Sequence, residues 1–281
     1  MSGIIELTLG HSPDPDDAFM FYGLAKDKLE TGPYRFTHVL QDIQTLNERA
    51  TRGELDITAI SIHAYAYVLD KYALLPAGAS MGFGYGPMVV AREMIAPTDL
   101  KGMTIAIPGK MTSAYLELQL AIGDFNAVHV PFDEIIQRVA SGEFSAGLII
   151  HEGQLTYQEA GLVECINLGK WWWEATGHTD WPLPLGGNAI HKRHGSHMKD
   201  ISDILTASIR YSLDNRQAAL DYALGWARDM GMDLADEFVG MYVNDWTLDY
   251  GDRGRASIRE LLDRGHAAGL IPAVKELEFV D

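Results

Sequence analysis

The most constraining feature of this chain is an alternation of short apolar strands with amphipathic helices over its first half. The pattern predicts strands at 4–10, 36–40, 57–61, 87–92, 104–107, 127–130 and 147–150, and helices at 18–24, 43–52, 112–122 and 133–141. Such alternation is typical of parallel sheets with helices on both faces. From about residue 197 onward the periodicity is helical only. We therefore assign the chain to the α/β class, with a helical C-terminal region.

The length of the chain predicts two lobes, because 281 residues exceed the usual size of a single hydrophobic core. The glycine-rich segment 78–86 is suited to carry the chain into a second lobe, and segment 182–191 is suited to bring it back. We expect lobe one to contain residues 1–92 and 185–281, and lobe two to contain residues 93–184. Each lobe is expected to be a sheet flanked by helices, with a cleft between the lobes that closes over a ligand.

Two segments of similar pattern indicate where that cleft places its polar side chains. Segments 53–61 and 142–150 each follow an amphipathic helix, turn at Gly-Glu and enter a buried strand. The identities are few, so chance similarity competes with a true repeat. In open α/β sheets, ligands bind just beyond the carboxyl ends of strands. If the lobes face each other, Ser61 and His151 look into the same cleft.

Thr112 and Ser113 follow a predicted strand and open a long helix. Their hydroxyls and the free backbone N–H groups of the first helical turn are suited to bind a carboxylate or phosphate. The alternative is that one of them simply caps the helix, which is the commonest use of Thr and Ser there. Capping and binding are compatible, so both interpretations stay open.

His151 ends a predicted strand, and histidine is the residue type best suited to proton transfer near working pH. The alternative is a buried histidine hydrogen-bonded to backbone. His191, His194 and His197 are more typical of a solvated polar loop than of a metal site. The acidic run at 14–17 lacks the Gly and the distal Glu of a calcium loop, so helix capping explains it better. Of the three tryptophans at 171–173, at least two are expected to serve packing.

Composition narrows the class of partner. The formal net charge of -17 repels nucleic acid, and the chain has no apolar run near the ~20 residues of a membrane span. We expect a small-molecule carboxylate partner, no nucleic acid and no membrane span; the sequence makes no prediction of an oligomeric state. The one cysteine, Cys165, excludes an intrachain disulfide. The first residues show neither the basic head nor the apolar run that is typical of a secretory signal. Together with the single cysteine, this favours a cytoplasmic protein.

Several runs resemble one known family. They are SPDPDDAFMFY at 12–22, GLIIHE at 147–152, GPMVVAR at 86–92, PLPLG at 182–186 and YVN at 242–244. The chain resembles the 1,4-dihydroxy-6-naphthoate synthases of the futalosine route to menaquinone. The resemblance runs along nearly the whole chain, and the run that contains His151 is its most specific part. Two departures are Asp14 and Asp16, where some relatives carry Cys and Asn, and a longer segment at 177–181.

This resemblance implies the two-lobed fold of type 2 periplasmic binding proteins, adapted to catalysis without a metal or organic cofactor. It implies a carbon–carbon lyase that converts cyclic de-hypoxanthine futalosine to 1,4-dihydroxy-6-naphthoate. His151 is then the proton acceptor, and the substrate contacts are Ala59, Ile60, Ser61, Thr112 and Ser113. The alternatives are the chorismate dehydratase of the same pathway and a non-catalytic solute-binding protein for a small carboxylate. Fold alone does not decide between them.

Overall fold

The computed structural model describes residues 3–226 and 231–280 of the chain and divides it into two compact units. Unit 1 comprises Met1–Ser80, Gly186–Asp252 and Val274–Asp281, and unit 2 comprises Met81–Leu185 and Arg253–Ala273. The expected alternation of strands and helices is present in both units. The α/β class is therefore confirmed.

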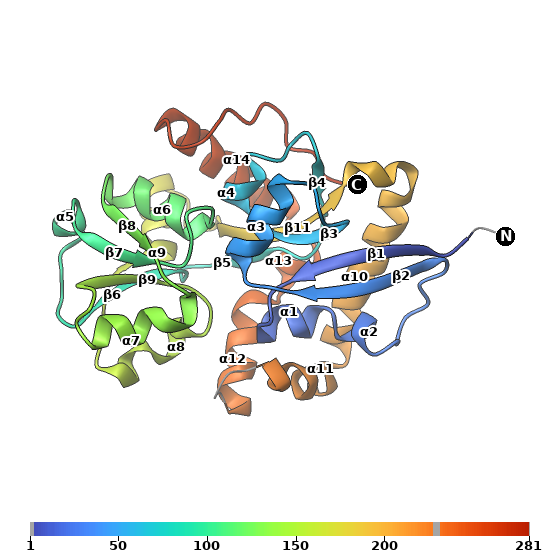
Figure 1. Cartoon of the computed structure of the whole chain (residues 1–281), viewed down its shortest axis with the longest axis horizontal. Helices are drawn as coiled ribbons and strands as arrows, with labels where there is room; N and C mark the ends of the chain where they lie inside the picture. Colours follow the sequence, from blue (N-terminus) through green and yellow to red (C-terminus); the bar gives the residue numbers. More distant parts are fainter. Residues whose placement is uncertain (1–2, 227–230, 281) are drawn as a thin grey trace. The chain divides into compact units, whose positions relative to one another are not determined.

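Unit 1 is built on a sheet of which β1, β2, β3 and β4 come from the N-terminal segment and β11 from later in the chain (Figure 1). Its strands are β1 Ile5–His11, β2 Tyr34–Leu40, β3 Ile57–Ser61 and β4 Tyr72–Leu74, with β11 Leu183–His191 and β5 Ser80–Gly82 reaching across the boundary of the unit. Its helices are α1 Pro15–Met20, α2 Tyr22–Ala25, α3 Ile43–Thr51, α4 Ile62–Tyr65, α10 Met198–Asp214, α11 Arg216–Ala223, α12 Met232–Tyr242 and α13 Asp245–Leu248.

Unit 2 is built on a five-stranded sheet. Its strands are β6 Met88–Ala91, β7 Thr104–Ile107, β8 Asn126–His129, β9 Ala146–Ile149 and β10 Val163–Asn167. Its helices are α5 Pro97–Leu100, α6 Ser113–Ile122, α7 Ile135–Ala140, α8 Gly153–Thr156 and α9 Leu168–Thr176, and most of α14 Gly251–Ala267 packs here as well. Within this unit, α6 lies on one side of the sheet and α7 on the other (Figure 1).

The two sheets share one topology. The strand order is β2-β1-β3-β11-β4 in unit 1 and β8-β7-β9-β6-β10 in unit 2. In each sheet the first three strands are parallel, and the fourth is antiparallel to both of its neighbours. The similar segments of the sequence occupy matching places, because α3, Gly53 and β3 correspond to α7, Gly142 and β9. Both glycines have positive φ, 68° and 86°, which glycine adopts without strain.

Each sheet is held to its helices by apolar side chains from both. In unit 1 the main cluster joins strand residues such as Leu7 and Leu9 to Phe19 of α1 and Ile209 of α10. In unit 2 a cluster joins strands β6, β7 and β9 to α7. Gly147 allows α7 to approach β9 closely, because a Cβ there would lie 2.5 Å from Ile135 Cγ2. The ends of the strands are thereby fixed relative to the helices of the same unit.

The boundaries of the units differ from the expected lobes in two places. Residues 81–92, expected in lobe one, belong to unit 2, and so do residues 253–273. Helix α14 packs there because Trp172 of α9 donates its indole N–H to Ser257 Oγ at 3.0 Å, and Ser257 in turn donates to Pro182 O at 2.6 Å. A fully buried indole needs such an acceptor. The chain therefore crosses between the units four times, not twice.

The described residues contain no helix that is both long and apolar enough to cross a membrane.

Candidate functional site

Strand β3 ends at Ser61, which is buried at the carboxyl end of the parallel part of the unit 1 sheet. Asn47 of α3 holds it twice: Asn47 Oδ1 accepts from the Ser61 backbone N–H at 2.9 Å, and Asn47 Nδ2 donates to Ser61 Oγ at 2.9 Å. Ala59 and Ile60 precede it on the strand and pair with Asn188 and Gly187 of β11. Ser61 is therefore the member of this trio that ends the strand with a polar side chain.

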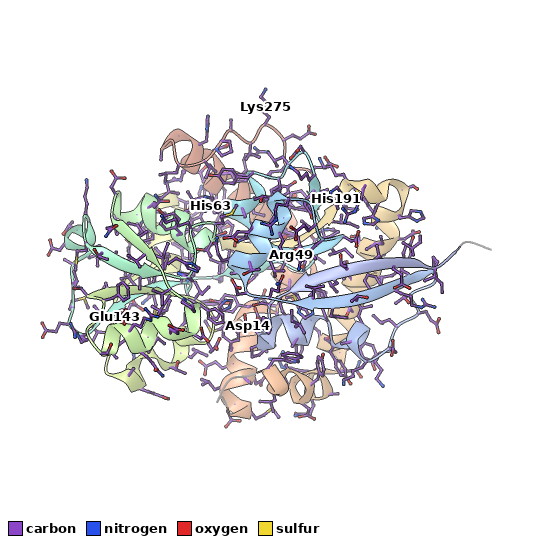
Figure 2. All side chains as sticks on the ribbon, viewed as in Figure 1. Asp14, Arg49, His63, Glu143, His191 and Lys275 are labelled. Atoms are coloured by element: carbon purple, nitrogen blue, oxygen red, sulfur yellow. The ribbon has the colours of Figure 1, made fainter. Side chains whose placement is uncertain are left out.

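The loop after β1 carries a buried acidic network within unit 1. Asp17 accepts from the Ser12 backbone N–H at 2.6 Å, and Ser12 Oγ donates to Asp14 Oδ2 at 2.5 Å. Burial, with the nearby charge of Asp14, raises the pKa of Asp17 to about 7. Asp14, labelled in Figure 2, stands at the N-cap position of α1, but its side chain makes no capping hydrogen bond. The expectation that the acidic run caps this helix is thus wrong for Asp14.

His11 ends β1 next to the same network. Its Nε2 lies 2.9 Å from His38 Nδ1 of β2, so one ring donates the proton and the other accepts it. Burial and the neighbouring His38 lower the pKa of His11 to about 4. Burial also lowers the pKa of His38. Both rings are therefore neutral at pH 7, and the pair adds no positive charge to this edge of unit 1.

In unit 2, strand β7 leads through a turn into the N-terminus of α6. Thr112 is the N-cap: its Oγ1 accepts from the Tyr115 backbone N–H at 3.2 Å and donates to Gly109 O at 2.9 Å. An N-cap of this kind is worth about 1 kcal/mol. The Ser113 hydroxyl donates to Leu185 O. Both hydroxyl protons are thus used within the protein, and a bound anion would meet the backbone N–H groups of the first turn.

Strand β9, parallel to β7, leads to His151. His151 has φ 57°, in the left-handed region that residues other than glycine rarely adopt. Its ring packs edge-on against Phe132 with centroids 4.7 Å apart, and its carbonyl accepts from the backbone N–H and the side chain of Gln154, both at 3.2 Å. Because β7 and β9 are parallel neighbours, His151 and the start of α6 lie at the same edge of the unit 2 sheet.

Glu152 follows His151 and is the N-cap residue of α8. Its Oε2 is buried and has no hydrogen-bond donor among the residues that the structure describes.

Glu117, one helical turn beyond Ser113, is fully buried. Within the described part of the chain, neither of its carboxyl oxygens has a hydrogen-bond partner. Burial raises its pKa well above the usual value, because it disfavours the charged form. Glu117 is therefore a buried acid whose surroundings favour the protonated form.

The remaining candidates have structural partners. His194 Nε2 contacts Asp56 Oδ1 at 2.8 Å, His197 contacts the Tyr34 hydroxyl at 2.9 Å, and His191 Nδ1 accepts from the Arg193 backbone N–H at 3.0 Å. Across residues 3–226 and 231–280, no three His, Cys, Asp or Glu side chains gather as they would around a metal ion. Trp172 is fully buried, and the Trp173 ring packs edge-on against Phe83 with centroids 5.3 Å apart, so the expected packing role of two tryptophans is confirmed.

The site candidates thus fall into two groups. Ala59, Ile60 and Ser61 lie in unit 1, whereas Thr112, Ser113 and His151 share one sheet edge of unit 2. Sequence reasoning missed Asn47, Gln154 and Phe132. A signal for Asn47 did exist: it occupies a core position of the helix, in register with Ile43, Leu46 and Ala50, where an apolar residue is expected.

The fold is that of the periplasmic binding proteins. The alkanesulfonate-binding protein of Xanthomonas axonopodis pv. citri has TM-score 0.68 at 14% identity, covering 97% of this chain and 96% of that one. A Candida albicans protein described as having the generic periplasmic-binding-protein fold has TM-score 0.72 at 13% identity, covering 98% and 93%. Both show the fold alone.

Closer relatives show the family. The family model described as "Menaquinone biosynthesis" matches residues 7–267, and the chain belongs to this family. It is 39% identical to the 1,4-dihydroxy-6-naphthoate synthase of Thermus thermophilus, over 94% of this chain and 95% of that protein. It is 38% identical to the enzyme of that name from Streptomyces coelicolor, over 95% of each. A solved Archaeoglobus fulgidus protein has TM-score 0.90 at 43% identity, covering 95% and 98%.

Proposed function

We propose that the protein is a 1,4-dihydroxy-6-naphthoate synthase, a carbon–carbon lyase that converts cyclic de-hypoxanthine futalosine to 1,4-dihydroxy-6-naphthoate in menaquinone biosynthesis. The observation that carries this proposal is the similarity, over nearly the full length, to two curated enzymes of that name. The fold alone would fit a transport protein equally well.

His151 is the proton acceptor in this proposal. A neutral imidazole removes a proton from a sugar hydroxyl or an acidic C–H of the substrate, and ring opening with carbon–carbon cleavage follows. Aromatisation of the new ring drives the reaction, so the protein has to supply positioning and a base. The support is the placement of His151 two residues after the end of β9, with its ring against Phe132 and its carbonyl held by Gln154.

Substrate contacts are assigned to Ala59, Ile60 and Ser61 in unit 1 and to Thr112 and Ser113 in unit 2. The backbone N–H groups at the start of α6 would hold the substrate carboxylate, because the first turn of a helix carries unsatisfied donors and the positive end of its dipole. The first turn of α6 contains no acidic residue that would oppose an anion.

We also assign the protein to the cytoplasm. The support is its single cysteine, Cys165, which leaves no intrachain disulfide to form.

The test is to incubate the purified protein with cyclic de-hypoxanthine futalosine, without added metal or cofactor, and to follow 1,4-dihydroxy-6-naphthoate by absorbance and mass. Formation of that product is the expected result. Conversion of chorismate instead would move the protein to the dehydratase of the same pathway. Tight binding of either compound without turnover would favour a solute-binding role, and both outcomes would contradict the proposal.

A further inference from the structure

The turn between β7 and α6 carries one exposed cation, Lys110. The residues before it, 105–109, are buried, and Thr112, two residues after it, is buried again. The backbone N–H and the hydroxyl of Thr112 both donate to Gly109 O, at 3.4 and 2.9 Å. Lys110 is the second residue of the turn that these bonds close, and Thr112 is the N-cap of α6. The position of Lys110 at the start of the helix is therefore fixed by the backbone around it.

The topology of the sheet separates Lys110 from the other cations between residues 81 and 152, which are Arg92, Lys101 and Arg138. Arg92 follows β6, which is antiparallel to β9, and Lys101 precedes β7, so both lie at the amino ends of the parallel strands. Arg138 is held in ion pairs with acidic side chains. Lys110 follows the carboxyl end of β7, and its ammonium makes no ion pair or hydrogen bond with the residues that the structure describes. Within 81–152 it is thus the one cation at the edge of the sheet where a ligand would bind.

The charge of the whole chain makes a cation at this edge important. A formal net charge of -17 repels an anionic ligand at long range. The N–H groups of the first turn of α6 attract an anion only at short range, because the effect of the helix dipole is confined to that turn. The field of an ammonium group extends further, since the Debye length is ~10 Å at 0.1 M salt. Lys110 can therefore act on an anion before the helix start does.

We propose that Lys110 is a positioning residue that steers the carboxylate of the substrate to the start of α6. This inference rests on the proposed function, which places the carboxylate there. The ammonium group attracts the anion during its approach, and the backbone N–H groups of α6 then hold it. Charges of this kind act mainly on the association rate. Lys110 therefore raises the association rate constant and kcat/KM, and it leaves kcat unchanged.

The probe is 2-naphthoate, an aromatic carboxylate, whose association rate constant is measured by stopped-flow fluorescence. At an ionic strength of ~0.01 M, the rate constant should fall about threefold in Lys110→Gln and about tenfold in Lys110→Glu. At ~1 M salt the Debye length shrinks to about 3 Å, so both variants should associate nearly as fast as wild type. A loss that disappears with salt is the signature of steering, because a change of local structure would persist.

Lys101→Gln and Lys101→Glu are the matched controls. They change the net charge by the same amounts at the opposite edge of the same sheet, and they should lower the association rate much less. The neutral analogue 2-naphthamide should associate equally fast with wild type and with every variant, because it carries no charge to be steered. With cyclic de-hypoxanthine futalosine, Lys110→Gln should lower kcat/KM about threefold at low salt, and kcat should stay at the wild-type value.

A wild-type association rate in Lys110→Glu at low salt would overturn the proposal. So would a loss that persists at ~1 M salt, an equal loss for 2-naphthamide, or an equal loss in Lys101→Glu. A wild-type protein that binds no 2-naphthoate would overturn it as well. If 2-naphthoate shows the predicted salt-dependent pattern but cyclic de-hypoxanthine futalosine is not converted, only the proposed function is overturned.

Discussion

The two units share one topology but differ in the charge of the side chains at matching helix starts. In unit 1 the strand β1 leads into α1, and in unit 2 the equivalent strand β7 leads into α6. The first turn of α1 carries Asp16 and Asp17, whereas the first turn of α6 carries no acid and begins with Thr112 and Ser113. The same scaffold thus makes one helix start that opposes an anion and one that attracts it.

The strand ends differ in a second way. Ser61, the last residue of β3, has ordinary extended backbone with φ -68° and is fixed through its side chain by Asn47. His151, after the equivalent strand β9, has φ 57° and is fixed through its backbone by Gln154. Ser61, which is proposed to contact the substrate, is held at its hydroxyl and its backbone N–H by Asn47. The residue proposed to act as the base is held at its carbonyl by Gln154, and its ring packs against Phe132.

The largest expected effect on ligand affinity comes from placing an acidic side chain at the start of α6, where α1 carries acidic residues. In Thr112→Asp the carboxylate still caps the helix, so the unfolding temperature should change little. A second negative charge about 6 Å from a bound carboxylate costs about 2–3 kcal/mol, so the Kd for 2-naphthoate should rise about 100-fold. Thr112→Asn, a neutral cap of the same shape, is the control. Equal affinity in the two variants would show that the ligand anion binds elsewhere.

The second prediction concerns Glu117 of unit 2, whose buried carboxyl should make the stability of the protein depend on pH. Its pKa is raised in the folded state, so the folded protein holds the proton more tightly than the unfolded chain does. The free energy of unfolding should therefore fall as the pH rises above the unfolded pKa of about 4.3. Glu117→Gln removes this dependence and should be more stable than wild type at pH 8 by about 1–3 kcal/mol, with little difference at pH 4. Denaturant titrations at both pH values check this, and parallel curves would contradict it.

Close packing at a strand glycine is testable in both units. A Cβ on Gly147 would lie 2.5 Å from Ile135 Cγ2, and a Cβ on Gly10 would lie 2.6 Å from Leu55 Cδ1. Gly147→Ala and Gly10→Ala should each cost about 1–3 kcal/mol of unfolding free energy. Gly3→Ala, where a Cβ meets nothing within 4 Å, is the control. A neutral result at either buried glycine would mean that the neighbouring side chain there can shift without cost.

The smallest effect is expected at the acidic network of unit 1. Asp17 has a raised pKa of about 7, so its contribution to stability falls as the pH rises from about 4 to 7. His11 has a lowered pKa of about 4, so its contribution is lost as the pH falls from about 6.5 to 4. The two dependences oppose each other in this window and partly cancel.

Asp17→Asn removes the pH dependence that is due to Asp17 and leaves that of His11. The amide oxygen of the variant still accepts from the Ser12 backbone N–H. Relative to wild type, the variant should gain about 1 kcal/mol or more between pH 5 and pH 8. Thermal unfolding at the two pH values measures the gain. If the variant and wild type differed in stability by the same amount at both pH values, Asp17 would ionise normally in the folded protein.

Much of the fold was predictable because buried strands and amphipathic helices have strong periods. Strands β3 and β7 begin and end as expected, and β9 is displaced by one residue. The similarity of segments 53–61 and 142–150 corresponds to the shared topology of the sheets. The position of α14 was not predictable, because it depends on a hydrogen bond between Trp172 and Ser257, 85 residues apart.

The candidate residues were predictable where they lie at or shortly after the carboxyl end of a strand, as Ser61, Thr112 and His151 do. The backbone conformation and hydrogen bonds of these residues were not predictable. The left-handed backbone of His151 and the hydroxyl bond from Ser113 to Leu185 depend on tertiary contacts that no local pattern encodes. Asn47 was accessible in principle, since an amide at a core position of a helix requires a partner.

The central claim is that His151 is the base, and it is tested most directly by turnover and binding in His151→Asn. Asn tolerates the left-handed backbone that the position demands, so the variant isolates the loss of the imidazole from backbone strain. We predict a fall in kcat of about 10²- to 10⁴-fold with the Kd for 2-naphthoate nearly unchanged, while His129→Asn on β8 of the same unit behaves as wild type. Turnover of cyclic de-hypoxanthine futalosine at the wild-type rate by His151→Asn would contradict the account.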